Sequence, residues 1–409
     1  MNEIAAATAS GRTVTLRFEK AEHDTRLAAT RAELKRRGLS ALLVFAQESH
    51  YYLTGFDTAG YVFFQVGIVT ADDRPTVLLT RRPDLRQAQV ASLYDDVRIW
   101  LNAEGARPAF DMKAILAELG LKDSRIGVEF ATYGLTGANS REVEAALAGF
   151  AEVVDGSDIV RRQRLVKSAS ELAYIRSAGQ LADAAVLAMV EKARPGVLDS
   201  VPTAAGVTAM LEGGGDMPAG GPLVNSGPRA LYGRGVAGPR RLEDTDQIMI
   251  ELGASYCRYN VCIEQTVVLG KIDPRQLAMH DVACDALSQV IEAARPGREL
   301  GTLDDIHRKV LDAAGFGQER FAACGYALGC TFRPTWMDVP PMIYSGNPLI
   351  MEANMVFFVH IMIPDTRTGL AAGVGQTFAL RESGPPEVFS SLPLALLSGA
   401  VSPPPSSPA

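Results

Sequence analysis

The sequence has little of what marks several large classes of protein. Only five of its 409 residues are cysteines, an odd number without CxxC spacing, so we expect reduced thiols rather than a disulfide framework. It has no long lysine or arginine block, and 40 basic against 47 acidic residues give a net charge of −7. Because clustered positive charge is what binds phosphate backbones, we expect no nucleic-acid partner.

Long apolar runs and targeting signals are also missing. The longest nearly apolar run, from Met355 to Pro364, contains His360 and is shorter than the roughly 18–20 residues that span a membrane. The first residues lack the basic start and apolar stretch of a signal peptide. We therefore expect no membrane partner and a cytoplasmic location.

What is present is the composition of a large folded protein. Hydrophobic residues make up 47% of the chain, and its length predicts two or three domains. Helix-like and strand-like segments alternate in the first part, which indicates an α/β arrangement. We expect helices near 26–37 and 112–119, and strands near 41–45, 62–70, 75–79 and 125–128.

A change of character near residue 160 predicts a domain boundary. Ser168 and Glu171 have the spacing of a capping box, so a long helix should begin there and end near Pro195. We expect a domain over 1–160, a second over 161–395 and a disordered proline-rich tail over 396–409. Further strands are predicted near 247–253, 262–269 and 355–363, and helices near 273–294 and 302–314.

One glycine motif suggests nucleotide binding but has the wrong context. Gly233 to Gly238 matches GxGxxG, yet Pro239 and two arginines follow it instead of an apolar helix. Gly213–Gly215 and Gly220–Gly221 lack the Lys-Ser/Thr of a phosphate loop. We interpret all three segments as turns or loops, and the sequence predicts no cofactor.

Two stretches resemble the metal-binding motifs of the pita-bread fold, which methionine aminopeptidases, prolidases, aminopeptidase P and creatinase share. They are Ile250–Gly270, and Cys324–Gly329 together with Met355–His360. Leu165–Ser168 and His50–Phe56 extend the resemblance over nearly the whole chain. It implies a mixed α/β (α+β) protein, with a creatinase-type N-terminal domain before a pita-bread catalytic domain.

The resemblance also implies which residues meet at the site. In the metallopeptidases of this family, two Asp, one His and two Glu hold a pair of divalent ions that activate water. The corresponding positions here are Glu251, Cys262, Tyr326, His360 and either Gly375 or Gln376. Because only one of these positions is a carboxylate, we predict no metal-binding residues at the site. This pattern is closer to creatinase and ectoine hydrolase, which break C–N bonds of small amidine-type compounds without metal.

These positions suggest roles that the residue types can fill. Glu251 would act as base or nucleophile, His360 as proton relay, and Cys262 as wall or alternative nucleophile. Tyr326 would donate a hydrogen bond to a developing anion. Glu251, Cys262 and His360 would also make a three-ligand zinc set. Purely structural roles stay open for each: a paired glutamate, a core histidine, an inert thiol and a buried tyrosine.

Other candidates concern substrate binding. Arg234 and Arg333 fall where histidines of the family usually lie, and guanidinium groups there would favour a carboxylate. In creatinase-like homodimers the first domain of one subunit closes the site of its partner. The substrate-contact candidates that follow are Phe56, Tyr61, Gln65 and, next to the last ligand position, Gln376.

The resulting hypothesis is a metal-independent hydrolase acting on a nonpeptide C–N bond of a small, carboxylate-bearing amidine or amide. Because a fold does not fix a reaction, a lyase or cyclase on the same scaffold is an alternative. A catalytically inactive, Xaa-Pro peptidase-like binding module is the other.

Overall fold

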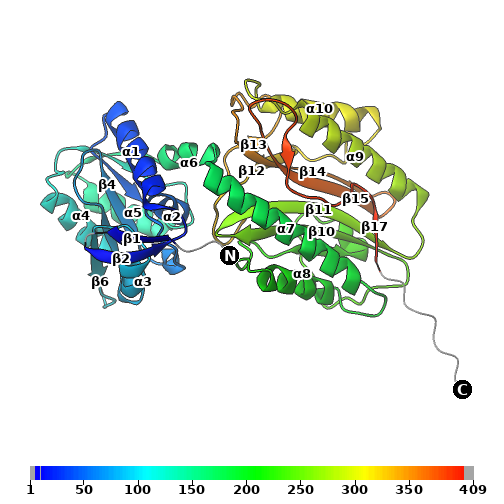
Figure 1. Ribbon diagram of the computed structural model, residues 1–409, viewed down its shortest axis with the longest axis horizontal. Helices are drawn as coiled ribbons and strands as arrows, with labels where there is room; N and C mark the ends of the chain where they lie inside the picture. The colour runs from blue at the N-terminus through cyan, green and yellow to red at the C-terminus, as the bar shows by residue number, and fades with distance from the viewer. Residues whose placement is uncertain (1–4, 10, 400–409) are drawn as a thin grey trace, which may run out of the picture. The chain divides into compact units, whose positions relative to one another are not determined.

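The computed structural model describes residues 5–9 and 11–399. The chain divides into two compact units, Met1–Arg164 and Leu165–Ala409 (Figure 1). This division lies close to the boundary near residue 160 that the sequence predicts.

The first unit contains a mixed six-stranded sheet with the order β6-β5-β4-β3-β7-β8 and a separate β1-β2 hairpin. Its strands are β1 Ala5–Ala9, β2 Arg12–Leu16, β3 Ala41–Val44, β4 Val66–Thr70, β5 Val77–Arg81, β6 Asp96–Trp100, β7 Arg125–Val128 and β8 Glu152–Asp155. Its helices are α1 Lys20–Arg36, α2 Gln47–Thr54, α3 Leu85–Val90, α4 Pro108–Glu118, α5 Gly137–Leu147 and α6 Asp158–Leu165, with short 3-10 turns η1 Gly60–Val62 and η2 Arg82–Asp84.

The central strand β3 shows why this unit has two layers of helices. All four of its residues are buried, and alternate side chains enter different hydrophobic cores. Leu43 packs with residues of α4 and α5, whereas Leu42 packs with Leu34 of α1 and Leu53 of α2. A strand buried on both faces reads as a continuous apolar run, which is how the sequence predicted it. The predicted α/β arrangement is confirmed.

The second unit contains a nine-stranded sheet with the order β13-β12-β14-β15-β11-β10-β9, where β16 pairs with β15 and β17 with β11. Its strands are β9 Leu223–Ser226, β10 Asp246–Tyr256, β11 Tyr259–Leu269, β12 Gly325–Ala327, β13 Met342–Ile343, β14 Val356–Asp365, β15 Leu370–Ala379, β16 Glu387–Val388 and β17 Leu397–Ser398. Its helices are α7 Ala169–Lys192, α8 Ser200–Glu212, α9 Pro274–Ala293 and α10 Gly301–Ala313, with the 3-10 turn η3 Gly227–Leu231.

Helices cover one face of this sheet and leave functional residues on the other. Phe357, Val359 and Ile361 of β14 belong to a hydrophobic core with residues of α9 and α10, and α9 lies along β14 and β15 in Figure 1. Because strand side chains alternate, Phe358 and His360 point to the opposite face. The same alternation applies to β11, where Tyr259 donates to Glu171 of α7 and the even-numbered residues point away from that helix.

Two structural predictions need correction. The strand expected over 62–70 begins only at Val66, because Gly60–Val62 forms η1 and the Val62 side chain is 61% exposed. The tail predicted to be disordered from 396 starts too early, since Leu397 and Ser398 pair in parallel with Val267 and Val268. Residues 400–409 lie outside the described residues. Within the described part of the chain, no helix combines the length and apolar character needed to cross a membrane.

The predicted capping box is present at the start of α7. The Ser168 hydroxyl accepts from the Glu171 amide at 3.1 Å, and a Glu171 carboxylate oxygen accepts from the Ser168 amide at 2.8 Å. We expect Ser168→Ala to lower the free energy of unfolding by about 1 kcal/mol, because it leaves a helix N–H without its partner. Chemical denaturation measures this, with Ser177→Ala in the same helix as a control expected to change stability by less than half as much. Equal effects of the two variants would contradict the prediction.

Candidate active site

Four neighbouring strands bring the candidate residues into one row across the sheet. Glu251 of β10 lies opposite Glu264 of β11, Glu264 lies opposite Gly375 of β15, and Gly375 lies opposite His360 of β14. Residues directly opposite each other share a face of the sheet. The row therefore places two carboxylates and an imidazole on one face.

A second row, two residues along the strands, adds a hydrogen-bonded cluster beside Glu251. The Tyr326 hydroxyl donates to Glu251 Oε1 at 3.0 Å and accepts from the Trp336 indole N–H at 2.8 Å. The Cys262 thiol lies 3.8 Å from the same carboxylate oxygen and 3.9 Å from the Tyr326 hydroxyl. The structure thus brings Glu251, Cys262 and Tyr326 together. The hydrogen bond from Trp336 fixes the position of the Tyr326 hydroxyl.

His360 is fixed by three neighbours. Its Nδ1 donates to Glu264 Oε2 at 3.1 Å, and its ring stacks on Phe358 with centroids 5.2 Å apart. The ring of Tyr326 meets it edge-on at 5.9 Å. Because Nδ1 is engaged by Glu264, Nε2 is the nitrogen left to exchange a proton with another group.

Burial and mutual charge shift the titration of these groups. Burial raises the pKa of Glu251, as does the charge of Glu264, against the opposing effect of His360. Burial alone would lower the pKa of His360, but the hydrogen bond and charge of Glu264 raise it above its ordinary value. Glu251 is therefore a stronger base than an exposed glutamate, and His360 keeps its proton to higher pH than an exposed imidazole.

The thiol and the phenol stay protonated. Burial, followed by the charge of Glu251, raises the pKa of the Cys262 thiol well above its ordinary value. The same two causes, together with Cys262, raise the pKa of Tyr326. A thiolate nucleophile is disfavoured in these surroundings, because nucleophilic cysteines have lowered pKa values and positively charged neighbours.

Two glycines of β15 make room for the row. A Cβ at Gly375 would lie 2.6 Å from the Phe358 ring and 2.9 Å from the Cβ of His360. A Cβ at Gly373 would overlap the Glu264 carboxylate and Met249. The side chains of Phe358 and His360 therefore fill the space above Gly375, and a larger residue there would displace them.

Three more predicted site residues belong to this unit: Arg234, Arg333 and Gln376. Arg234 is exposed, yet its charge lowers the pKa of both Glu251 and His360, so it lies near the row. Arg333 lines a cavity with Gly220 and Gly221. Gly375 lies in the row, on the face of the sheet that carries the site. Because side chains alternate along a strand, the next residue, Gln376, points to the other face. The substrate-binding prediction for Gln376 does not fit this row, and that for Arg333 stays a prediction.

The candidates in the first unit also need correction. Phe56 is 0% exposed and packs with Tyr94 and His50 in a core of that unit. Gln65 is 1% exposed, and its amide is bonded to Gln47 and Thr80. Neither side chain is accessible to a substrate, because each is committed to the interior. Tyr61 is half-buried in η1 and stays a prediction.

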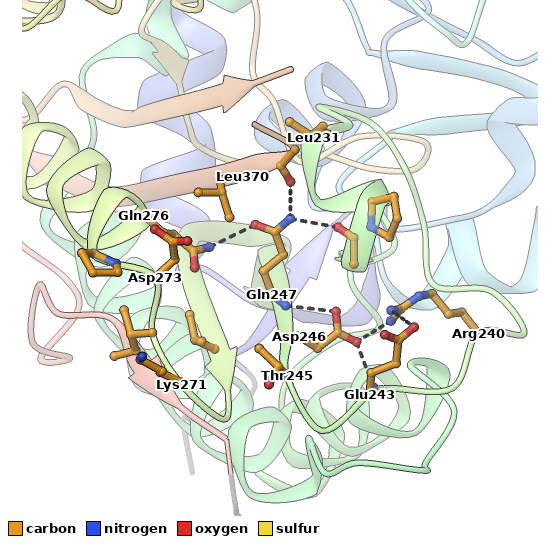
Figure 2. Close-up of a pocket in the computed structure, with 16 residues that line it drawn as sticks. Leu231, Arg240, Glu243, Thr245, Asp246, Gln247, Lys271, Asp273, Gln276 and Leu370 are labelled. Atoms are coloured by element: carbon orange, nitrogen blue, oxygen red, sulfur yellow. Dashed lines mark hydrogen bonds and ion pairs between the residues drawn. The ribbon is translucent and has the colours of Figure 1, made fainter. Parts of the chain in front are cut away.

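A separate cavity of about 670 Å³ opens at the far end of β10 (Figure 2). Figure 2 shows Gln247 at its centre, bonded to Gln276, with Arg240 held between Glu243 and Asp246. Met249 separates Gln247 from Glu251 along the strand. The row, in contrast, brings two carboxylates and an imidazole onto one face, so we place the candidate active site there.

Comparison with known proteins identifies the family. Residues 173–382 match metallopeptidase family M24, and residues 26–166 match the creatinase/prolidase N-terminal domain. The chain belongs to metallopeptidase family M24. Its two-domain pita-bread architecture is the one the resemblance implied, and the chain is assigned to the hydrolases of this family.

The relatives of this chain include proteins named as dipeptidases and one named as an ectoine hydrolase. A Xaa-Pro dipeptidase of Pyrococcus furiosus is 29% identical over 209 residues, 51% of this chain and 59% of that protein. An ectoine hydrolase of Halomonas elongata is 23% identical over 360 residues, 84% of this chain and 90% of that protein. The prolidase structure from Thermococcus sibiricus has a TM-score of 0.82 at 18% identity, covering 92% of this chain and 99% of that one. Because the sequence identity is low, this structural similarity establishes the fold alone.

The residues present do not fit the pair of metal ions that the M24 name implies. A bimetallic site needs bridging carboxylates, but at two of the five positions stand Tyr326, which stays protonated, and Gly375, which has no side chain. Among residues 11–399, the set of three metal-ligating side chains with atoms within 4.8 Å of one another lies elsewhere. The alternative zinc set of Glu251, Cys262 and His360 is therefore not assembled.

Two functional residues were missed in the sequence. Glu264 lies two positions after Cys262 on one strand, and the period-two alternation of β11 was the signal that both face the site. Glu251 is still the one carboxylate among the five ligand positions, and Glu264 adds a second carboxylate beside them. Trp336 was not given a role, because the chain between it and β12 contains no regular element that would predict its contact with Tyr326.

Proposed function

We propose that the protein hydrolyses a nonpeptide C–N bond of a small amidine or amide without a catalytic metal ion. The observation that carries the proposal is the row of Glu251, Glu264, Gly375 and His360, in which acid and imidazole occupy positions of the family's metal ligands. The ectoine hydrolase relative, aligned over 84% of this chain, supports the same class of reaction.

In the proposed reaction, Glu251 takes a proton from water, and the water oxygen bonds to the amidinium carbon. The C–N bond breaks, and protonated His360 gives its proton to the leaving nitrogen. Burial moves the pKa of Glu251 towards neutral pH, where a general base is most effective. Glu264 favours the protonated imidazole that the second step requires.

The charges of the site select the substrate class. Glu251 and Glu264 favour a cationic centre such as an amidinium, because a cation would offset two buried negative charges. Arg234, whose charge reaches both Glu251 and His360, would hold a carboxylate at the open side of the row. We therefore propose a zwitterionic substrate with an amidine and a carboxylate group.

A substrate screen tests the proposal. Ectoine, creatine, related cyclic amidines and Xaa-Pro dipeptides would be incubated with the protein and followed by mass spectrometry. We expect a cyclic amidine to gain the mass of one water, or an open-chain amidine to give two products whose masses sum to the substrate plus one water, and no cleavage of the dipeptides. Dipeptide cleavage would overturn the proposal, elimination or ring closure would favour a lyase or cyclase, and no turnover of any compound would favour the binding module.

Cys262 is proposed as a wall of the site. We expect Cys262→Ala to lower kcat on the screened amidine by less than about tenfold, because a thiol that stays protonated is a small hydrophobe. Steady-state kinetics measure this, and intact-protein mass spectrometry under turnover checks for an adduct. A loss of more than about 100-fold together with a trapped adduct on Cys262 would establish a nucleophile instead.

We also propose that the protein forms a homodimer. Val62 and Phe63, beside Tyr61, expose 61% and 47% of their surface, and adjacent apolar residues of this size favour a partner. Light scattering after gel filtration would give twice the chain mass of 43.7 kDa, and Phe63→Glu should reduce it to the monomer. The cytoplasmic location stays a prediction.

A further inference from the structure

A second cluster of reactive side chains lies where α10 meets the residue that precedes β12. Asp304 and His307, one helical turn apart on α10, meet Cys324, which directly precedes β12. One ligand atom from each lies within 4.8 Å of the other two. All three side chains are buried, with 0–2% of their surface exposed.

The donor atoms are those that zinc prefers. An imidazole nitrogen, a thiolate sulfur and a carboxylate oxygen are the three kinds of protein ligand for Zn²⁺, at bonds of about 2.0–2.3 Å. Tetrahedral bonds of that length place neighbouring donors roughly 3.3–3.6 Å apart. His307 Nδ1 and Asp304 Oδ1 are 2.9 Å apart, so small side-chain rotations would admit an ion.

Neighbouring groups orient the carboxylate. Arg308 Nε and the Ser345 amide both donate to Asp304 Oδ2, at 2.7 and 3.0 Å, and leave Oδ1 directed at His307. Partners of this kind fix the ligands of metal sites and tune their basicity.

We propose that Asp304, His307 and Cys324 form a zinc site. Binding releases the thiol proton of Cys324 to solvent, so the carboxylate and thiolate charges balance the ion. The carbonyl of Cys324 accepts from the His360 amide at 2.9 Å, so the ion would also tie α10 to the strand that carries His360. The site is structural and independent of the proposed reaction.

Metal binding to the whole chain tests this directly. Chelator-treated protein would be titrated with Co²⁺, which gives a near-ultraviolet thiolate-to-metal band when a cysteine ligates it, and with Zn²⁺ followed by desalting and elemental analysis. We expect one Zn²⁺ per chain, one proton released and a thiolate band. Wild-type protein that shows neither a band nor retained zinc would overturn the proposal without any variant.

Matched variants locate the ion. Cys324→Ser and His307→Gln should each reduce retained zinc at least tenfold and abolish the band. Cys262→Ser and Cys284→Ser should keep both. Cys284 is the stricter control because its thiol lies 3.5 Å from a ring nitrogen of His280. If the band disappears in a control variant and persists in Cys324→Ser, the proposal is wrong, and His307→Gln decides if Cys324→Ser does not fold.

Discussion

Glu251→Gln is expected to lower kcat on the screened amidine by about 10³-fold, and to raise KM as well, because the variant also loses a charge that attracts the cationic substrate. The amide has nearly the same shape and still accepts from Tyr326, but it cannot take a proton from water. General base catalysis contributes roughly 10²–10⁴ in rate, so its loss should appear in kcat. Steady-state kinetics of the purified variant measure the effect.

The pH profile separates a chemical role from a structural one. The pKa of Glu251 is raised by burial, so in the wild type kcat should rise as pH increases through that raised value. The Gln variant should lose this rise and keep its melting temperature. Glu352→Gln, a change to an exposed residue, should retain full activity. A Glu251→Gln protein with more than a tenth of wild-type kcat would exclude Glu251 as the base.

The fold was predictable because its signals are local. The apolar run of β3 and the spacing of Ser168 and Glu171 can each be recognised within a few residues, because a strand buried on both faces has consecutive apolar residues and a capping box joins residues three apart. The errors occurred where tertiary packing decides. Leu397–Ser398 becomes a strand only because β11 offers it a partner, and Phe56 is a core residue because Tyr94, 38 positions later in the sequence, packs on it.

The candidate site was predictable only in part, for a related reason. Matching motifs to ligand positions finds residues that replace metal ligands, such as Cys262 and His360. It does not find Glu264, which occupies none of those positions and contributes through the cross-strand row. Its significance depends on Gly375, whose missing side chain lets the Glu264 carboxylate reach the imidazole across a strand.

Glu264→Gln is the sharpest test of how this row works. Glu264 is a positioning residue in our proposal, since it acts through His360. Its hydrogen bond and charge are what raise the pKa of His360 against burial. The variant should therefore move the alkaline fall of kcat to lower pH, because the imidazole loses its proton earlier. We expect kcat at pH 8 to fall about 100-fold, within the range for a proton donor.

The same variant should lower stability more at low pH than at high pH. A histidine whose pKa is raised on folding adds stability that is fully present below about pH 6.5 and is lost as pH rises through the folded value. Glu264→Gln should therefore cost about 3 kcal/mol at pH 6, as expected when one partner of a buried ion pair is removed, and clearly less at pH 9. Urea denaturation at the two pH values measures this difference. Glu264→Asp, which keeps the charge, should retain part of both effects, and a loss of stability that is equal at pH 6 and pH 9 would show that Glu264 does not hold the proton on His360.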